Sequence, residues 1–253
     1  MRRQAEIAKQ EVSKSKDNAP TMNTYVISYK RSDTTKVHTL LEYCTYVIRE
    51  SERKDYEKLG VNLLCVEDSK VNSFANVNNW LIENAPEDVI AVLDDDISQF
   101  MYQKEKIKVI DKETTSREIE RLCQLLYDLD VGLLGIRIGS IPYGYLAEFH
   151  FSGMIGPLRI YNRKKVKARY INMPFFGDTD FVLQELLLNR IILRPDYLVT
   201  NVEIELNKGG MNISRNKKQQ DETAEQMQNK WGKYFSFKSS GKFSNVTKVM
   251  VQR

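Results

Sequence analysis

The sequence predicts an α/β fold, with a mostly parallel central sheet flanked by helices and a more irregular, mixed α/β C-terminal half. Short runs of β-branched and aromatic residues are typical of buried strands. Over roughly the first hundred residues these runs alternate with helix-forming segments, which favours parallel strands covered on both faces. The later apolar runs are shorter and lie closer together, which predicts the irregular second half.

In the first half, the strands are the apolar runs, and the helices between them end at recognisable residues. Gly60 is placed as a C-terminal cap for a polar helix. Pro86 ends a second helix, whose apolar residues recur at helical spacing. The expected strands are residues 24–29, 44–48, 61–66 and 89–93, and the expected helices are residues 52–59 and 73–84.

The second half opens with an amphipathic helix and continues with shorter elements. The last expected helix is polar, and the tail after it adds one or two strands. The expected helices are residues 114–129, 179–189 and 219–231, and the expected strands are residues 131–138, 146–151, 157–161, 191–193 and 198–203.

Length and composition limit the class of protein. The chain has 253 residues, of which 42% are hydrophobic, and this excludes wholesale disorder. No apolar run approaches the roughly 20 residues that cross a bilayer, and no apolar signal core follows the first residues. Three cysteines lie far apart, which fits neither a disulfide framework nor a zinc site. We therefore expect a cytoplasmic protein without a membrane partner.

The chain is expected to form one domain behind a mobile leader. Residues 1–22 are polar and show no periodicity, so they are interpreted as the leader. Residues 23–253 contain no internal repeat and are interpreted as a single domain.

Three consecutive carboxylates, Asp94, Asp95 and Asp96, directly follow the apolar strand predicted over residues 89–93. In an open α/β sheet, ligands bind beyond the carboxyl ends of the strands. The three like charges repel one another, and a divalent cation between them relieves the repulsion. Oxygen ligands suit Mg²⁺ or Mn²⁺, which bind through one or two carboxylates and substrate phosphates. The alternative is an acidic turn that caps the next element.

Charged residues also stand at the end of one predicted strand and at the start of one predicted helix. Lys30 and Arg31 follow Tyr29 at the end of the first strand, and an ordinary basic surface is the alternative. Asp178 and Asp180 open the helix over residues 179–189, where backbone amides hold a carboxylate ionised. Asp178 can then accept a hydrogen bond from a hydroxyl, and Asp180 is expected to cap or brace the helix. Plain N-capping is the alternative.

A glycine pair and a late histidine are weaker candidates. Gly209 and Gly210 allow a loop to swing and its backbone to approach a ligand, with Lys208 and Arg215 beside it. His150 lies in the alternating run EFHFSG, where a buried strand position is the expected role. Ligation of a metal is the alternative for this histidine.

Six basic residues and no acid lie between residues 159 and 170. Such a segment can neutralise the phosphates of a nucleic acid, with Tyr161 and Tyr170 available to stack on a displaced base. A solvated surface is the alternative. The candidate nucleic-acid-binding residues are Arg159, Arg163, Lys164 and Lys165.

The segments VIAVLDDDI, ISYKRSD, FFGDTDF and the GGM loop together resemble GT-A glycosyltransferases, whose central sheet is Rossmann-like. Their order and spacing are most similar to the phage glycosyltransferases associated with TET-type oxygenases, which are related to the C-terminal domain of the GREB proteins. The resemblance covers roughly residues 23–235. One departure is Gly177, which stands where the acidic motif of the family usually has Glu.

The resemblance implies a UDP-sugar donor, Mn²⁺ or Mg²⁺ as cofactor, a nucleotide-sugar-binding half over residues 23–100 and an acceptor half over residues 101–253. Asp96 would hold the metal together with Asp94, which also contacts the ribose, and Asp178 would be the catalytic base. The implied donor-binding residues are Tyr29, Lys30, Arg31, Asp94, Asp95, Lys208, Gly209, Gly210 and Arg215.

The expected function is the transfer of a hexosyl or pentosyl group to a hydroxyl acceptor. The resemblance implies 5-hydroxymethylcytosine, or another hydroxymethyl pyrimidine, in phage DNA within the host cytoplasm. A glycosyltransferase with a protein or glycan acceptor is one alternative, and a non-catalytic nucleic-acid-binding module is another. A nucleotidyltransferase shares the α/β half and the metal carboxylates, but no Gly-rich, Lys- and Arg-bearing signature precedes the first helix.

Overall fold

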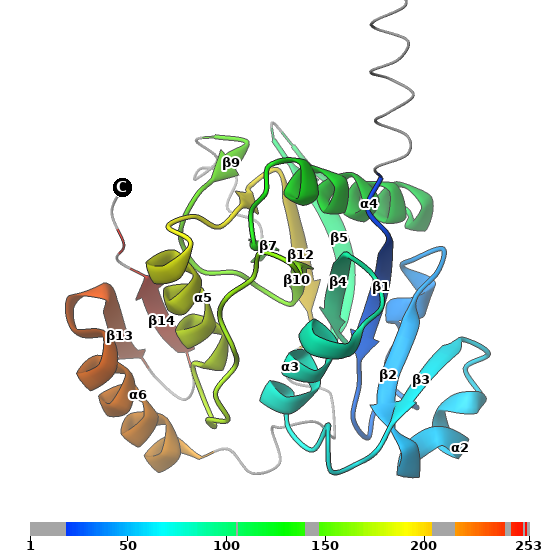
Figure 1. Ribbon diagram of the computed structural model, residues 1–253, viewed down its shortest axis with the longest axis horizontal. Helices are drawn as coiled ribbons and strands as arrows, with labels where there is room; N and C mark the ends of the chain where they lie inside the picture. The colour runs from blue at the N-terminus through cyan, green and yellow to red at the C-terminus, as the bar shows by residue number, and fades with distance from the viewer. Residues whose placement is uncertain are drawn as a thin grey trace, which may run out of the picture.

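The computed structural model describes residues 19–104, 106–139, 147–203, 216–240, 244–249 and 251, apart from the side chains of residues 238–240 and 244–248. At its centre lies a six-stranded sheet in the order β3-β2-β1-β4-β10-β7 (Figure 1). All its strands run parallel except β10, which is antiparallel to both of its neighbours. The strands are β1 (Met22–Ile27), β2 (Thr45–Arg49), β3 (Asn62–Val66), β4 (Val89–Asp94), β7 (Leu133–Gly135) and β10 (Leu158–Asn162).

Helices cover both faces of this sheet. On one face lies α4 (Lys112–Asp128), and on the other lie α3 (Phe74–Asn84) and α5 (Gly177–Leu188). A side-chain oxygen caps the start of two of them: Ser73 accepts a hydrogen bond from the Asn76 amide before α3, and Asp111 accepts one from the Thr114 amide before α4.

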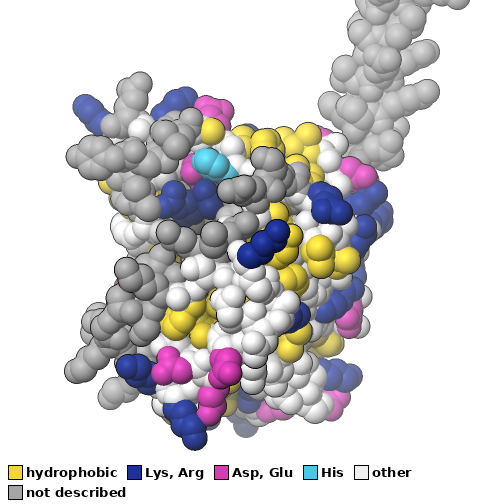
Figure 2. Space-filling model, turned by 90° about the vertical axis from the view of Figure 1, so that its left-hand side faces the viewer, with side chains coloured by type: hydrophobic (Ala, Val, Ile, Leu, Met, Phe, Trp, Pro, Cys, Tyr) yellow, Lys and Arg dark blue, Asp and Glu magenta, His cyan; other side chains and the backbone are white. Residues whose placement is uncertain are grey.

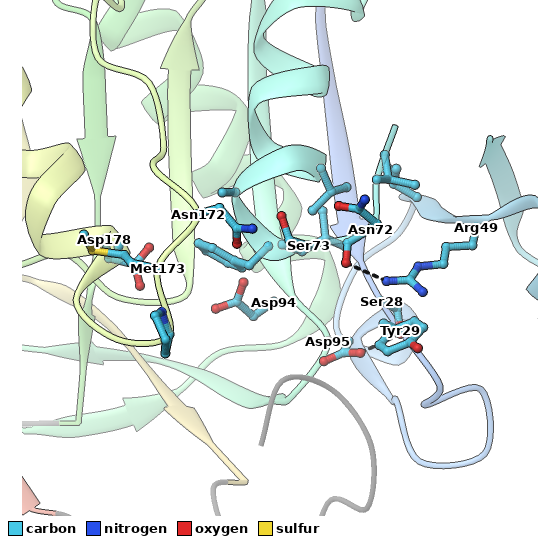
Figure 3. Close-up of a pocket in the computed structure, with 18 of the residues that line it drawn as sticks. Ser28, Tyr29, Arg49, Asn72, Ser73, Asp94, Asp95, Asn172, Met173 and Asp178 are labelled. Atoms are coloured by element: carbon cyan, nitrogen blue, oxygen red, sulfur yellow. Dashed lines mark hydrogen bonds between the residues drawn. The ribbon is translucent and has the colours of Figure 1, made fainter. Parts of the chain in front are cut away.

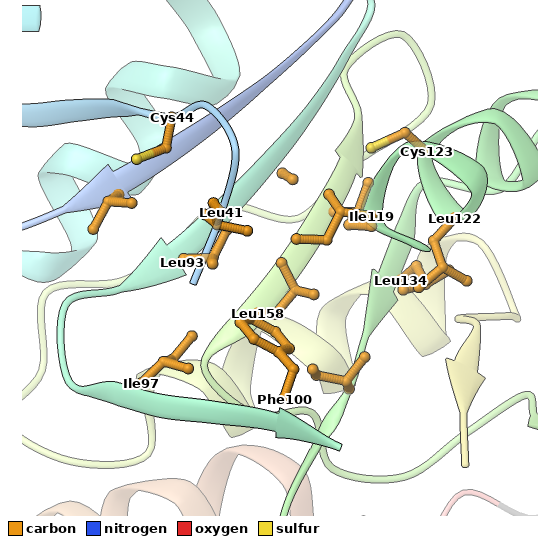
Figure 4. Close-up of a cluster of buried hydrophobic side chains, with 14 of the residues drawn as sticks. Leu41, Cys44, Leu93, Ile97, Phe100, Ile119, Leu122, Cys123, Leu134 and Leu158 are labelled. Atoms are coloured by element: carbon orange, nitrogen blue, oxygen red, sulfur yellow. The ribbon is translucent and has the colours of Figure 1, made fainter. Parts of the chain in front are cut away.

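Strand β4 supplies side chains to both hydrophobic layers, because alternate residues of a strand point to opposite faces. Ala91 and Leu93 belong to the core beneath α4, part of which Figure 4 shows, including Leu93, Leu158 and Phe100. Ile90 and Val92 belong to the core beneath α3 and α5. Because β4 is buried on both sides, the residues that follow it are held in a fixed place.

A second, four-stranded sheet begins directly after the acidic triplet, since Asp95 and Asp96 form the turn between β4 and β5. The Glu203 amide donates a hydrogen bond to the Asp96 carbonyl at 2.9 Å, which ties this turn to the strand β12. The sheet has the order β6-β5-β12-β8, with β5 (Ile97–Gln103), β6 (Ile107–Val109), β8 (Arg137–Ile138) and β12 (Leu198–Val202).

The remaining elements are smaller. Strand β9 (Phe149–His150) pairs with β11 (Arg194–Pro195), and α6 (Lys217–Trp231) leads into the hairpin of β13 (Phe235–Ser240) and β14 (Ser244–Val249). Figure 1 shows α6 and this hairpin beside α5. The short helices are η1 (Val37–Thr39), η2 (Glu50–Glu52), α2 (Arg53–Glu57) and η5 (Gly232–Tyr234). No helix in the described part of the chain is both long and apolar enough to cross a membrane.

The predicted α/β fold is confirmed, and so are two strands in the tail, but several predicted elements differ. The helix over residues 52–59 shrinks to η2 and α2. The strand over residues 131–138 splits after Gly135 into β7 and β8, which belong to different sheets. Residues 191–193 contribute only a single bridge, from Leu193 to Leu134.

Three strands, β5, β6 and the two-residue β11, were not predicted. The buried apolar residues of β5, Ile97, Phe100 and Met101, do not alternate strictly with polar ones, which conceals the strand in the sequence. Residues 1–18 of the predicted leader lie outside the described residues, and Met22 already belongs to β1, so the predicted leader extends one residue too far.

Candidate active site

A cavity of about 270 Å³ opens at the carboxyl ends of β1, β2 and β4. This is the edge at which open α/β sheets bind ligands. Figure 3 shows Asp94 between Asp178 on one side and Ser73 and Arg49 on the other. One wall comes from Ser28, Tyr29, Arg49, Asn72 and Ser73, the floor from Asp94, Asp95 and Asp96, and the other wall from residues 171–178. The cavity therefore brings together the predicted metal, donor and catalytic carboxylates.

A buried arginine from the neighbouring strand holds Asp94. Arg159 of β10 donates from Nη1 to Asp94 Oδ2 at 3.3 Å and from Nη2 to Asp94 Oδ1. Its side chain has no exposed surface. Burial by itself would lower the pKa of Arg159, but the charge of Asp94 raises that pKa well above its usual value, so the guanidinium stays charged. The prediction that Arg159 belongs to a nucleic-acid-binding surface is wrong.

Asp95 points into the protein and is 7% exposed. Its Oδ2 accepts a hydrogen bond from Ser28 Oγ at 2.6 Å, and its Oδ1 accepts one from Arg31 Nη1 at 2.5 Å. Arg31 is buried as well, and the Tyr56 hydroxyl accepts a bond from its backbone amide. Asp95 and Arg31 line the cavity but are bonded to each other, so their binding of a donor stays a prediction.

Among the three carboxylates, the negative charge of Asp96 is the one least neutralised by a neighbouring arginine. Its Oδ2 lies 3.5 Å from Arg31 Nη1, and its side chain is 25% exposed in the cavity. Burial, followed by the charges of Asp94 and Asp95, raises the pKa of Asp96 to about 6. The ionised carboxylate is therefore destabilised in its surroundings, and a cation beside it would relieve this.

These residues fit a divalent cation that is held jointly by the protein and by phosphate oxygens. Among the described residues, no three His, Cys, Asp or Glu side chains converge to form a complete ligand set. Both oxygens of Asp94 are bonded to Arg159, which leaves Asp96 as the better placed ligand. Mg²⁺ and Mn²⁺ suit such a site, because they bind through one or two carboxylates and complete their coordination with phosphates and water.

Asp178 lies across the cavity in the first turn of α5. Its side chain is 42% exposed, and its Oδ1 lies 3.8 Å from Arg159 Nη1. The preceding Phe176 has a left-handed backbone conformation, with φ of 62°, and its ring packs on Phe235 and Phe237. A bulky residue keeps such a conformation only where its surroundings enforce it. Strand β13 therefore fixes the start of α5 and with it Asp178.

Asp180 is fully buried and braces the same helix. Its Oδ1 accepts hydrogen bonds from Lys230 Nζ at 2.6 Å and Trp231 Nε1 at 2.8 Å, and its Oδ2 accepts one from Gln184 Nε2 at 2.6 Å. Asp180 was expected to cap or brace the helix, and these bonds confirm that it braces it. The bonds from Lys230 and Trp231 attach the end of α6 to the start of α5.

Tyr29 and Arg49 lie at the rim of the wall that Ser28, Asn72 and Ser73 also form. The Arg49 guanidinium lies 3.8 Å from the centre of the Tyr29 ring, and its Nη2 donates to the Asn72 carbonyl at 2.9 Å. Lys30 is exposed and does not line the cavity. Sequence reasoning missed Arg49. Its signal was present in the sequence, since Arg49 ends the second strand at the same edge of the sheet.

The other three candidate nucleic-acid-binding residues, Arg163, Lys164 and Lys165, have partners within the protein. Arg163 donates hydrogen bonds to three backbone carbonyls at and beyond the end of α3. Lys164 Nζ lies 2.6 Å from Asp88 Oδ1, and Lys165 Nζ lies 2.7 Å from Asp130 Oδ2. The partners come from distant parts of the chain, so a count of charges along the segment does not reveal them.

Tyr161 and Tyr170 are also placed differently from the prediction. Both are buried, and their hydroxyls share a hydrogen bond of 2.8 Å, so the prediction that they stack on a displaced base is wrong. On the face that Figure 2 shows, basic side chains lie among acidic and apolar ones. The binding of nucleic acid by Arg163, Lys164 and Lys165 stays a prediction.

The two weaker candidates are His150 and the glycine loop. His150 does belong to a strand, β9, but it is only half-buried and does not line the cavity. Its Nε2 lies 3.0 Å from Asp196 Oδ2. The glycine loop, with Lys208, Gly209, Gly210 and Arg215, falls outside the described residues.

Comparisons with known proteins identify the fold. A scan against protein-family models found no match, and a search of curated proteins also found none. Among solved structures, a mannosyltransferase from Pyrobaculum calidifontis, in complex with GDP-mannose and Mn²⁺, superposes with a TM-score of 0.52 at 12% identity. The match covers 74% of this chain and only 58% of the mannosyltransferase.

A second similar structure is glucosyl-3-phosphoglycerate synthase from Mycobacterium tuberculosis, in complex with Mn²⁺, UDP-glucose and phosphoglyceric acid. It superposes with a TM-score of 0.51 at 8% identity, over 90% of this chain and 86% of the synthase. The chain therefore has the GT-A fold, as the sequence predicts. At these identities the likeness establishes the fold alone.

Proposed function

We propose that this chain is a metal-dependent glycosyltransferase that moves a sugar from a nucleoside diphosphate to a hydroxyl group. One observation carries the proposal: Asp94, Asp95 and Asp96, at the carboxyl end of β4, and Asp178, at the start of α5, line one cavity. The nucleotide-sugar complexes of the mannosyltransferase and of the synthase, which share the fold, support it.

On the donor side, Asp94 binds the nucleoside, and the rim of Tyr29 and Arg49 offers a flat surface and a cation beside it. Asp96 would hold Mn²⁺ or Mg²⁺, which would supply positive charge to the leaving diphosphate. The N-terminus of α3 borders the same cavity through Ser73 and Phe74, and the positive end of its dipole favours an anionic group there.

On the acceptor side, Asp178 accepts a hydrogen bond from the attacking hydroxyl. It takes the proton as the hydroxyl oxygen bonds to the anomeric carbon and the bond from that carbon to the diphosphate breaks. Its position in the first turn of α5, beside the charge of Arg159, favours the ionised carboxylate that this step needs.

For the acceptor, the resemblance to phage DNA glycosyltransferases makes a hydroxymethyl pyrimidine in DNA the first candidate. Lys164 and Lys165 are already paired with acidic residues of the protein, so the described basic segment does not support a DNA acceptor. The cavity wall of residues 171–178 carries the apolar side chains of Ile171, Met173 and Pro174. They favour an acceptor that has a flat or apolar face next to its reacting hydroxyl.

The test is incubation with Mn²⁺ and a panel of nucleotide sugars, with and without hydroxymethylated DNA, its free nucleoside, or hydroxyl-bearing glycans. A glycosyltransferase releases the nucleoside diphosphate, slowly as hydrolysis without an acceptor and faster with the right one. Asp96→Asn is expected to abolish both reactions. Asp55→Asn, which changes an exposed aspartate on α2, is the matched control and is expected to keep both.

The products also separate the alternatives. Release of pyrophosphate from a nucleoside triphosphate would identify a nucleotidyltransferase. Binding of nucleic acid without turnover of any nucleotide sugar would identify a binding module. Either result would contradict the proposed function.

A further inference from the structure

Arg159 is a fully buried charge that packs beside an aromatic ring. Its guanidinium carbon lies 5.0 Å from the centre of the Phe74 ring. Tyr161, two residues further along β10, is fully buried on the same side of the sheet. Taking a guanidinium out of water is costly, and apolar replacements of buried ion pairs are often neutral or stabilising. Stability of the fold alone does not account for an arginine at this position.

The contacts of Arg159 reach both sides of the cavity. Two bonds to the two oxygens of Asp94 form a fork that fixes the plane of that carboxylate. The contact with Asp178, 3.8 Å from Nη1 to Oδ1, exceeds the length of a hydrogen bond and acts through charge. Asp178 is thus attracted towards Arg159 while 42% of its side chain stays exposed.

We propose that Arg159 is a positioning residue that sets the placement of Asp94 relative to Asp178, and through them the placement of the donor relative to the acceptor. This inference rests on the function proposed above. Without the guanidinium, the two carboxylates would repel each other across the cavity. A lysine would keep the charge but lose the fork, because an ammonium is a single point of charge on a flexible stem.

The test uses Arg159→Lys and Arg159→Met, alone and combined with Asp94→Asn or Asp178→Asn. Arg169→Met is the matched control, since Arg169 lies in the same basic segment but is exposed and paired with Glu83. For each protein we would measure the transfer rate kcat, the affinity for UDP with Mn²⁺, and the melting temperature.

In the wild-type background, Arg159→Lys is expected to lower kcat by about tenfold or more, because small misplacements of reacting groups have large effects on rate. In the Asp178→Asn background the same change is expected to lower the residual kcat by less than about threefold, since the partner is already lost. Likewise, Arg159→Lys is expected to weaken UDP binding in the wild type but not in the Asp94→Asn background. Arg169→Met is expected to stay within about twofold of the wild type.

A merely structural role would give another pattern. Equal losses in every background, in step with the melting temperature, would overturn the inference. It would also be overturned if both Arg159 variants failed to fold while Arg169→Met folds.

Failure of the proposed function is a separate outcome, in which the wild type neither binds UDP with Mn²⁺ nor turns over any nucleotide sugar. The melting temperatures of the same single and double variants need no donor. They then test whether Arg159 couples Asp94 and Asp178, and additive shifts would contradict that coupling.

Discussion

At the scale of single residues, the acidic triplet consists of three different carboxylates. Asp94 is paired with Arg159 and Asp95 with Arg31, and Asp96 carries the charge that is compensated least. The mutual repulsion expected from the sequence is therefore concentrated on one side chain. This difference determines what each substitution does.

Replacing Asp96 should stabilise the metal-free protein at neutral pH. The pKa of Asp96 is raised from 3.8 to about 6 in the folded chain, so the folded state binds a proton more tightly than the unfolded state. The free energy of unfolding therefore falls as the pH rises from about 4 through 6. We expect metal-free Asp96→Asn to be more stable than the wild type by roughly 1–3 kcal/mol at pH 7.5. Thermal unfolding at several pH values should show the difference shrinking towards pH 4, and a constant difference would contradict this origin.

Replacing Asp178 should separate chemistry from donor binding. An amide cannot take a proton, so Asp178→Asn is expected to lower kcat by about a hundredfold or more. Its affinity for UDP with Mn²⁺, measured by calorimetry, is expected to stay near that of the wild type, because Asp178 lies on the acceptor wall. If the affinity fell in step with the rate, Asp178 would be a donor-binding residue.

At the scale of elements, the start of α5 depends on segments that follow it in the chain. The rings of Phe235 and Phe237 hold Phe176, and Lys230 and Trp231 at the end of α6 hold Asp180. The acidic turn depends in a similar way on β12, through the bond from the Glu203 amide. The two sides of the cavity are thus fixed by separate elements.

The bond network of Asp180 should be measurable as stability. Asp180→Asn leaves buried donors poorly matched and is expected to lower the free energy of unfolding by about 2–4 kcal/mol. Trp231→Phe removes one N–H donor and keeps an aromatic ring. This change is expected to lower the free energy of unfolding by about 1–2 kcal/mol. Urea titration checks both values. Equal stability of Asp180→Asn and the wild type would mean that α6 does not brace α5.

The sequence predicts elements well where a periodic pattern is complete. The buried run of β4 and the amphipathic α4 lie where the pattern places them, within a few residues. Strand β5 was missed because its pattern is broken, and β7 and β8 were merged because nothing local marks their change of sheet. Charges that follow predicted strand ends, such as Asp96, do line the cavity. The pairing of Arg159 with Asp94 was not predicted, because the two residues lie far apart in the sequence.

At the scale of the whole molecule, the cavity joins two stretches of chain, residues 27–96, which hold the proposed nucleotide side, and residues 171–178, which hold the proposed acceptor side. Within the described part of the chain, three arginines (Arg31, Arg49 and Arg159) and four aspartates (Asp94, Asp95, Asp96 and Asp178) line or contact it. The charges nearly balance, so strong binding of a bare cation is not expected. A cation and an anionic donor together would restore the same balance.

Binding of the metal should therefore depend on the nucleotide. We expect Mn²⁺ alone to bind weakly, and UDP to raise its affinity by about tenfold or more, with an equal effect of Mn²⁺ on UDP. Titration of Mn²⁺ followed by electron paramagnetic resonance, with and without UDP, checks this. Asp96→Asn is expected to remove the effect and Asp55→Asn to keep it. The same Mn²⁺ affinity in both conditions would show that the protein alone completes the metal site.

The pairing of β4 with β10 has a consequence for the growing chain on the ribosome. Leu93 pairs with Leu158, and Arg159 follows directly, so a nascent chain that has emerged only through β5 contains the acidic triplet but not the arginine that faces it. Until β10 arrives, β4 is an open edge of the sheet, and such edges invite pairing with other chains. Insertion of β10 closes that edge and completes the contacts of Asp94 in one event. An unfinished copy that lacks β10 and α5 therefore also lacks Arg159 and Asp178, and under the proposed function no sugar transfer is expected from it.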